Sequence, residues 1–139
     1  PQLTKLASRN RRRAEAVSDF REAIAPVATW LRVVTHSAGS QAAYYKLAWS
    51  YLPAEQNQAS RTHLIAALDA AGLPIDAGFR GFARRRQSGG RCRQVGSLVH
   101  SQRLGTSTLL LHHPILLAQK IVIRRAIEAL IHTVQQVAS

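Results

Sequence analysis

The chain has 139 residues, a length typical of one domain, and 46% of them are apolar, which is enough to bury a core. Basic residues outnumber acidic ones by 19 to 7, and the formal net charge is +12. These values argue against two full domains and against a disordered chain, and no apolar segment approaches the roughly 20 residues of a membrane-spanning helix. The single cysteine, Cys92, excludes an internal disulfide and a cysteine-based metal cluster.

The first twenty residues are rich in arginine and contain no long apolar segment, so they do not resemble a secretory signal. We therefore expect a soluble, cytoplasmic protein without a membrane partner. The sequence contains no methionine, which indicates either that an initiator was removed or that the chain is a piece of a longer protein.

A long amphipathic helix is predicted over residues 2–25. Its apolar residues recur at steps of three, four and seven and so share one side of a helix: Leu3, Leu6, Ala7, Ala14, Val17, Phe20 and Ile24. Arginines cover its middle and acidic residues follow, with Glu15 spaced for an ion pair with Arg12. Pro26 is expected to end the helix.

Two strands around a turn are predicted next, over residues 29–35 and 42–51. Strand alternation places one set of the second strand's residues on the core face: Tyr45, Leu47, Trp49 and Tyr51. The alternate residues face the other way. Lys46 is one of them, so we expect it on the solvent side of a strand rather than in a Schiff base, although aromatic residues surround it in the sequence.

Ser60 is the predicted N-cap of a short helix, which Gly72 is expected to stop. Its inner face carries four apolar residues: Leu64, Ile65, Leu68 and Ala71. A strand over 73–79 follows, and the sheet-and-helix core is predicted to extend over 29–82. Residues 84–93 are crowded with arginine and glycine, which is typical of an exposed loop.

The last part, residues 94–137, is predicted to contain a short helix over 96–104, a strand over 106–111 that His112-His113-Pro114 closes, and a C-terminal helix over 117–137. That last helix carries apolar residues at alternating steps of four and three: Ile123, Ile127, Leu130, Val134 and Val137. Together the elements predict one α/β domain over 1–139, with a small mixed sheet of about four strands and helices packed on it.

The sequence contains no complete catalytic site, and we predict no catalytic residue and no metal ligand. The acids have ordinary helical spacing except Asp76, for which a structural ion pair with an arginine is favoured. Adjacent strand residues point to opposite faces, so His112 and His113 do not easily share a metal ion. A Gly-rich phosphate loop and a Gly-x-Ser-x-Gly elbow are both absent.

Three stretches of the sequence, taken in order, form a set. They are Gln2-Leu3 with Leu6, Asn10, Arg13 and Ala16; Ser60-Arg61 through Leu64 and Leu68 to Gly72-Leu73-Pro74; and Arg93-Gln94-Val95-Gly96-Ser97-Leu98 continuing to His113-Pro114. The set resembles the C-terminal part of the DegT/DnrJ/EryC1/StrS family of pyridoxal-phosphate-dependent sugar aminotransferases. The resemblance spans nearly the whole chain and implies the small domain of a fold type I aminotransferase.

Departures from the family pattern bear on function. Residues 78–82 replace the His-Tyr-x-Pro-Leu-His run that the family often has, and Leu111 stands where a proline is usual. The family's Ser-x-x-Lys stretch, whose lysine holds the cofactor, does not occur, nor does the Gly-Tyr-Asn-Tyr-Arg-like segment that reaches a neighbouring subunit's cofactor phosphate. The resemblance therefore implies a domain that holds no pyridoxal phosphate and is not catalytic alone, and that needs a large domain or a homodimer mate.

Within a complete enzyme, the resemblance implies pyridoxal phosphate as cofactor and a nucleotide-linked keto-sugar as substrate. Arg80 and His113 are the candidate substrate contacts, because loops beside strands commonly carry sites. An alternative starts from charge: a basic nucleic-acid-binding module that uses the arginines between Arg9 and Arg13 and between Arg84 and Arg93. No aromatic stacking pattern accompanies them. A pure dimerisation unit is a third alternative, which the sequence does not separate from the first.

Overall fold

The computed structural model describes residues 3–53, 60–78, 81 and 95–138. In chain order its elements are the 3₁₀ helix η1 (Leu3–Lys5), α1 (Leu6–Ala23), the 3₁₀ helix η2 (Ala25–Val27), β1 (Leu31–Val33), β2 (Lys46–Tyr51), α2 (Arg61–Ala70), β3 (Ile75–Asp76), α3 (Val99–Ser107), β4 (Thr108–His112), α4 (His113–Leu116) and α5 (Lys120–Ala138). This order confirms the predicted α/β fold class. The predicted exposed loop at 84–93 lies outside the described residues.

The four strands form one sheet in the order β1-β2-β4-β3. Trp49 of β2 lies opposite Leu109 of β4, and Ile75 of β3 lies opposite Leu111 of β4. All three pairings are antiparallel, so the sheet is not mixed. The reason lies in the strand order: β2 and β3, which α2 connects, run in the same direction, but β4 lies between them and runs opposite to both.

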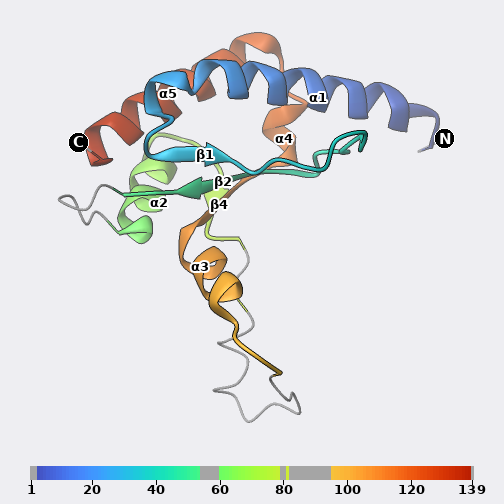
Figure 1. The fold of residues 1–139 in the computed structure, drawn as a ribbon. Helices are drawn as coiled ribbons and strands as arrows, with labels where there is room; N and C mark the ends of the chain where they lie inside the picture. Colours follow the sequence, from blue (N-terminus) through green and yellow to red (C-terminus); the bar gives the residue numbers. More distant parts are fainter. Residues whose placement is uncertain (1–2, 54–59, 79–80, 82–94, 139) are drawn as a thin grey trace.

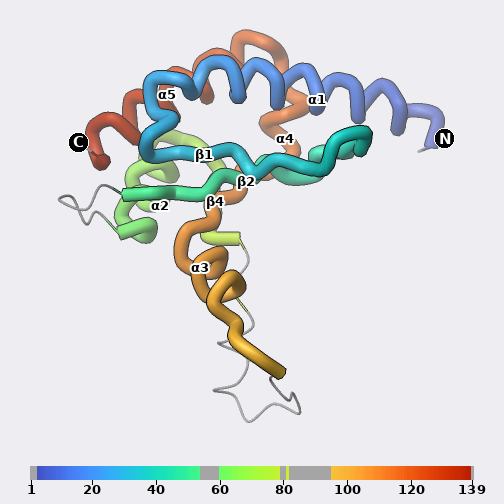
Figure 2. The backbone as a smooth tube through the Cα atoms, viewed as in Figure 1, coloured from blue at the N-terminus to red at the C-terminus, as the bar shows by residue number. Residues whose placement is uncertain are grey.

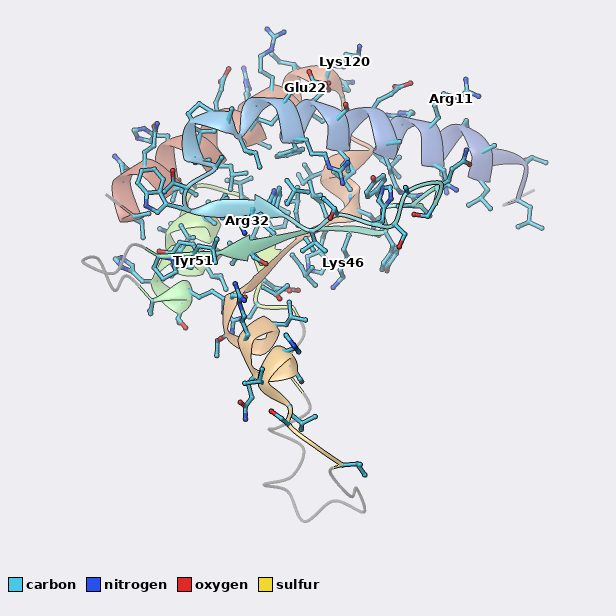
Figure 3. The ribbon with its side chains drawn as sticks, viewed as in Figure 1. Arg11, Glu22, Arg32, Lys46, Tyr51 and Lys120 are labelled. Atoms are coloured by element: carbon cyan, nitrogen blue, oxygen red, sulfur yellow. The ribbon has the colours of Figure 1, made fainter. Side chains whose placement is uncertain are left out.

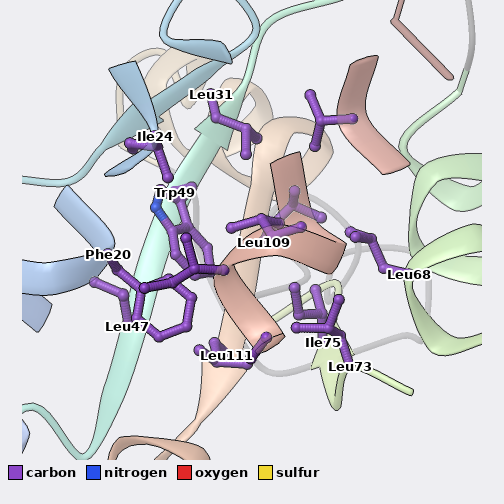
Figure 4. Close-up of a cluster of buried hydrophobic side chains, with 14 of the residues drawn as sticks. Phe20, Ile24, Leu31, Leu47, Trp49, Leu68, Leu73, Ile75, Leu109 and Leu111 are labelled. Atoms are coloured by element: carbon purple, nitrogen blue, oxygen red, sulfur yellow. The ribbon is translucent and has the colours of Figure 1, made fainter. Parts of the chain in front are cut away.

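The core lies between one face of the sheet and the helices that cover it. Figure 1 shows α1 and α5 across one side of the sheet, with α3 extending away on the other side. The residues predicted for the core face of β2 alternate as expected, and Leu47, Trp49 and Tyr51 are buried. Figure 4 shows Leu47 and Trp49 with Leu109 and Leu111 of β4 in the core. Phe20 of α1 packs edge-on against Trp49, with ring centroids 5.9 Å apart.

The C-terminal helix has the predicted inner face. The predicted residues Ile123, Ile127, Leu130 and Val134 are all buried in α5. The helix begins at Lys120 rather than at 117 because the chain first makes the short helix α4, with Pro114 in its first turn.

The N-terminal helix buries only half of its predicted apolar side. Val17, Phe20 and Ile24 are buried, but Leu3 is 82% exposed and Leu6 is 49% exposed. The difference has a geometric cause, because the first half of α1 extends past the sheet and the other helices (Figure 2).

The predicted ion pair between Glu15 and Arg12 is replaced by a longer-range contact. The Arg12 guanidinium Nη2 donates to the Leu117 carbonyl at 2.5 Å. That carbonyl lies at the end of α4, where unpaired carbonyls attract positive charge.

The two adjacent tyrosines before β2 take the opposite positions from those predicted. Tyr44 has a φ of 45° and packs against the core, while Tyr45 is 65% exposed. Strand alternation begins only at Lys46, where β2 starts, so it does not extend back to Tyr45.

The caps predicted for the second helix are confirmed. The Ser60 hydroxyl accepts from the His63 backbone N–H at 3.2 Å, and Leu64 and Leu68 are buried. Gly72 has a φ of 81°, and its N–H and that of Leu73 donate to carbonyls of the last turn, which is a Schellman ending. Ala71 is exposed rather than on the inner face.

The remaining elements are shifted by a few residues from the prediction. The strand predicted over 73–79 is β3, which ends at Asp76 because Asp76 Oδ1 accepts the Gly78 N–H at 2.6 Å and turns the chain. The helix predicted over 96–104 is α3, and the strand predicted over 106–111 is β4.

Candidate functional site

Polar side chains gather on the outer face of the sheet, opposite the core. Strand pairing places Lys46, the first residue of β2, directly opposite His112, the last residue of β4. The β3–β4 register places Asp76 opposite Leu110, one diagonal step from His112. Figure 3 shows the Lys46 side chain on the side of the sheet away from α1. We call Lys46, Asp76 and His112 the Asp76 cluster.

The Asp76 carboxylate is the centre of this cluster. Its Oδ2 lies 2.6 Å from His112 Nε2 and 3.8 Å from Lys46 Nζ, while Oδ1 accepts the Gly78 N–H. The three side chains are between a third and a half exposed. One carboxylate therefore joins residues from β2, β3 and β4 on a surface that solvent reaches.

The surroundings of Asp76 keep its carboxyl ionised at neutral pH. Partial burial by itself raises the pKa of Asp76, but the hydrogen bonds from His112 and Gly78 and the charge of Lys46 outweigh burial and hold the pKa below its ordinary value. An ionised carboxylate only accepts hydrogen bonds, so His112 Nε2 is the nitrogen that carries the proton.

His113, one of the two predicted substrate contacts, lies next to the Asp76 cluster. Its ring stacks on the exposed Tyr45 ring, with centroids 4.7 Å apart and planes 22° apart. Tyr45 precedes Lys46 and His113 follows His112, and Lys46 and His112 lie opposite each other on neighbouring strands. The stacked rings are therefore at the same end of the sheet as Lys46 and His112. The other predicted contact, Arg80, lies outside the described residues.

Asp76 does form a structural ion pair, as predicted, but within the described residues its charged partners are Lys46 and His112 rather than an arginine. Part of the signal was present in the sequence. Alternation in β2 places Lys46 on the outer face, and the buried Leu109 and Leu111 imply the same for His112. Strand order was the missing information, since residues 46, 76 and 112 meet only when β4 lies between β2 and β3.

Several residues of the family-like stretches hold the fold together. Arg13 donates to the Asn10 side chain at 2.9 Å. Arg61, at the start of α2, donates to the Ala77 carbonyl at 3.1 Å and to the Thr108 carbonyl at 3.0 Å. The first contact joins neighbouring turns of α1, whereas the Arg61 contacts tie α2 to the segment after β3 and to the start of β4.

The described residues do not fit the attachment of pyridoxal phosphate. Such attachment needs a lysine in a pocket that favours its neutral amine. The sequence has three lysines. Lys5 and Lys120 are exposed at or near the start of helices, and Lys46 is ion-paired with Asp76 on an open face. Within the part of the chain that the structure describes, no three His, Cys, Asp or Glu side chains could hold a metal ion, and no helix is long and apolar enough to cross a membrane.

The first arginine cluster of the nucleic-acid alternative is partly used within the fold. Arg12 is bound to the Leu117 carbonyl, and Arg13 is half-buried and bound to Asn10. Arg9 and Arg11 remain exposed. The second cluster, Arg84 to Arg93, lies outside the described residues, so this alternative stays a prediction.

No protein-family model and no curated protein matches the sequence. Solved structures do match it, and those described next each cover nearly the whole chain. The aminotransferase from Psychrobacter cryohalolentis has a TM-score of 0.78 at 18% identity, over 99% of this chain and 37% of that one. The 3-amino-5-hydroxybenzoic acid synthase has a TM-score of 0.76 at 19% identity, over 97% and 36%.

A third match has a different activity and contains the cofactor. It is the E. coli GDP-4-keto-6-deoxy-D-mannose-3-dehydratase with bound hydrated PLP, with a TM-score of 0.73 at 15% identity, over 93% of this chain and 32% of that one. At such identities the likeness shows the fold alone. The chain thus has the fold of one part of these enzymes and spans about a third of their length.

Proposed function

We propose that the chain is the C-terminal small domain of a pyridoxal-phosphate-dependent sugar aminotransferase of the DegT/DnrJ/EryC1/StrS family. The observation that carries the proposal is that 97–99% of the chain superposes on one third of an aminotransferase and of a related synthase. The second family-like stretch supports it, because Ser60 caps α2 and Arg61 ties that helix to the segment after β3. The domain works in the cytoplasm together with a large domain, which holds the cofactor.

In the complete enzyme this domain contributes to binding a nucleotide-linked keto-sugar. The stacked rings of His113 and Tyr45 offer a flat surface for a sugar or base, and each ring is adjacent in sequence to a member of the Asp76 cluster, His112 or Lys46. Arg80, four positions after Asp76, is the candidate for the substrate's phosphates, because guanidinium groups bind phosphate through paired hydrogen bonds. The domain binds and orients substrate, while the chemistry takes place on the cofactor of the large domain.

The test is a chimera in which this chain replaces the matching third of the Psychrobacter cryohalolentis aminotransferase. We expect the chimera to fold and to show the absorbance of lysine-bound pyridoxal phosphate. The 139-residue chain mixed with pyridoxal phosphate is expected to show none. The Lys46→Arg variant is the matched control, since it keeps the charge beside Asp76 but cannot form an imine.

Two results contradict the proposal. One is a stable imine in the isolated chain that borohydride traps and that Lys46→Arg abolishes. The other is a chimera that does not fold or does not retain pyridoxal phosphate, because a true small domain must support the cofactor-holding part.

A further inference from the structure

The first half of α1 carries a row of apolar side chains that nothing in the described structure covers. Leu3 is 82% exposed, Leu6 is 49% exposed, and Ala7 and Ala14 are also exposed. They continue the same side of the helix that farther on buries Val17 and Phe20. Single exposed apolar residues need no explanation, but a continuous row on an amphipathic helix indicates a surface that another structure covers.

This row forms one wall of a groove of about 840 Å³, which we call the α1 groove. The opposite wall comes from residues 36–44, the segment between β1 and β2 (Figure 2), and includes His36, Ala42 and Tyr44. Hydrogen bonds hold that wall in place, because His36 Nε2 lies 2.9 Å from the Tyr44 hydroxyl and Nδ1 lies 2.9 Å from the Ser40 hydroxyl. The groove is thus a preformed surface.

Every charged residue in the first half of α1, the helix that lines the α1 groove, is basic. Between residues 3 and 14 the charged residues are Lys5, Arg9, Arg11, Arg12 and Arg13, with no acid among them. Figure 3 shows Arg11 on the part of α1 that extends past the sheet. An occupant of this groove must therefore present apolar side chains together with acidic groups.

One guanidinium lines the α1 groove itself. Arg11 is among the groove's lining residues, and its side chain is exposed. An acidic group of an occupant can therefore pair with Arg11 when it enters the groove.

The size of the similar enzymes indicates where the occupant comes from. The chain aligns over 97–99% of its own length yet spans only 36–37% of two of those proteins. An enzyme of that size therefore has about two thirds of its structure outside this chain. A second copy of the chain is a poorer partner for the groove, because two basic halves of α1 would face each other.

We propose that the α1 groove is the surface on which the large, cofactor-holding part of the enzyme docks. The docked segment is apolar where it meets Leu3 and Leu6, and it carries a carboxylate that accepts from Arg11. This inference rests on the proposed function and adds the surface through which the small domain contacts the large part of the enzyme. Docking holds the small domain against the large one, so its loss separates the two and releases the cofactor.

The test compares Leu6→Asp with Val122→Asp, in the isolated chain and in the chimera. The two positions are matched, since Val122 is 41% exposed and each change places an aspartate in the first turn of a helix. In the isolated chain we expect both variants to unfold at the wild-type urea midpoint. In the chimera we expect Val122→Asp to behave as wild type, and Leu6→Asp to release pyridoxal phosphate about tenfold faster or more, as the loss of one buried interface side chain implies.

A second variant tests the polar part of the interface. Arg11→Gln removes the charged donor that lines the groove and is expected to speed the release of pyridoxal phosphate from the chimera. The exposed Arg124→Gln of α5 is its control.

The outcomes separate this inference from the proposed function. A wild-type chimera that retains the cofactor, with Leu6→Asp and Arg11→Gln both indistinguishable from their controls, overturns the docking surface alone. A wild-type chimera that does not fold or holds no cofactor contradicts the proposed function, and the docking surface falls with it. An isolated chain that sediments as a dimer, which Leu6→Asp dissociates, shows that a second copy occupies the groove and overturns the inference as well.

Discussion

A single left-handed residue decides which of two adjacent tyrosines faces the core. Tyr44 has a φ of 45°, a conformation that costs a non-glycine residue about 1 kcal/mol. The hydrogen bond between Tyr44 and His36 and the Arg21 guanidinium over its ring help to offset that cost. Alternation along a strand cannot predict this reversal, because a pattern of period two holds only after the strand has begun.

Asp76 is the residue that joins the outer face of the sheet. Its carboxylate contacts Lys46 and His112, and it also fixes the turn at Gly78 that ends β3. Its effect on stability follows from its lowered pKa. A carboxyl whose pKa is lower in the folded chain than in the unfolded one stabilises the fold at pH values above the unfolded pKa of about 3.9, and the effect is lost as the pH falls through the folded value.

The substitution Asp76→Asn tests this dependence. We expect it to lower the free energy of unfolding by about 1 kcal/mol near neutral pH, a small value because the side chain is half exposed. The difference from wild type should shrink below about pH 4, where the wild-type carboxylate begins to gain its proton. Urea unfolding across this range measures both curves.

The control for this prediction is Asp69→Asn, since the Asp69 side chain is exposed near the end of α2 and makes no ion pair within the described residues. It should be neutral or slightly stabilising, because a negative charge near a helix C-terminus is unfavourable. If Asp76→Asn lowers the free energy of unfolding by the same amount at neutral and at acid pH, the ionised carboxylate is not the source of that stability.

At the scale of elements, local patterns predicted most of the fold. The cap at Ser60, the stop at Gly72 and the inner face of α5 each depend on residues within a few positions of one another, and all three are present. The half-covered α1 and the Asp76 cluster depend on what lies across the molecule. Periodicity identifies the apolar side of a helix, but it does not say whether the chain supplies a surface to cover it. Arg80, the other part of the predicted site, lies outside the described residues.

Two glycines end elements for different physical reasons. Gly72 ends α2 with a φ of 81°, and a Cβ there meets no atom within 4 Å. Gly78 follows β3 with a φ of 60°, and a Cβ there lies 2.6 Å from both Cγ and Cδ1 of Leu110. Position 72 needs glycine only because its backbone is left-handed. Position 78 needs glycine also because a Cβ there would collide with the Leu110 side chain.

Alanine at each glycine separates these two requirements. We expect Gly72→Ala to cost about 1 kcal/mol, the price of a left-handed alanine. Gly78→Ala should cost roughly 2 kcal/mol or more, because Leu110 must move as well. The pair Gly78→Ala and Leu110→Ala should be less destabilising together than the sum of the two single changes, since the second change removes the clash. Thermal or urea unfolding of the four variants checks this, and strict additivity contradicts the close approach.

At the scale of the whole molecule, charge is unevenly compensated. The chain carries 19 basic and 7 acidic residues, and the ion pairs of the described part both involve Asp76. Self-repulsion of this kind destabilises a compact fold. It also favours an acidic partner, which agrees with a docking surface that is basic along the first half of α1.

Salt should therefore stabilise the isolated chain. Between about 0.01 M and about 0.15 M sodium chloride the screening length falls from about 30 Å to about 8 Å, so repulsion among the basic residues weakens. We expect the free energy of unfolding in urea to rise by roughly 1 kcal/mol over this range. The double variant Arg9→Gln with Arg11→Gln removes two exposed charges from the basic half of α1 and should show a smaller rise. If the free energy of unfolding falls with added salt, attractive ion pairs outweigh repulsion among the basic residues. The net charge then no longer supports an acidic partner.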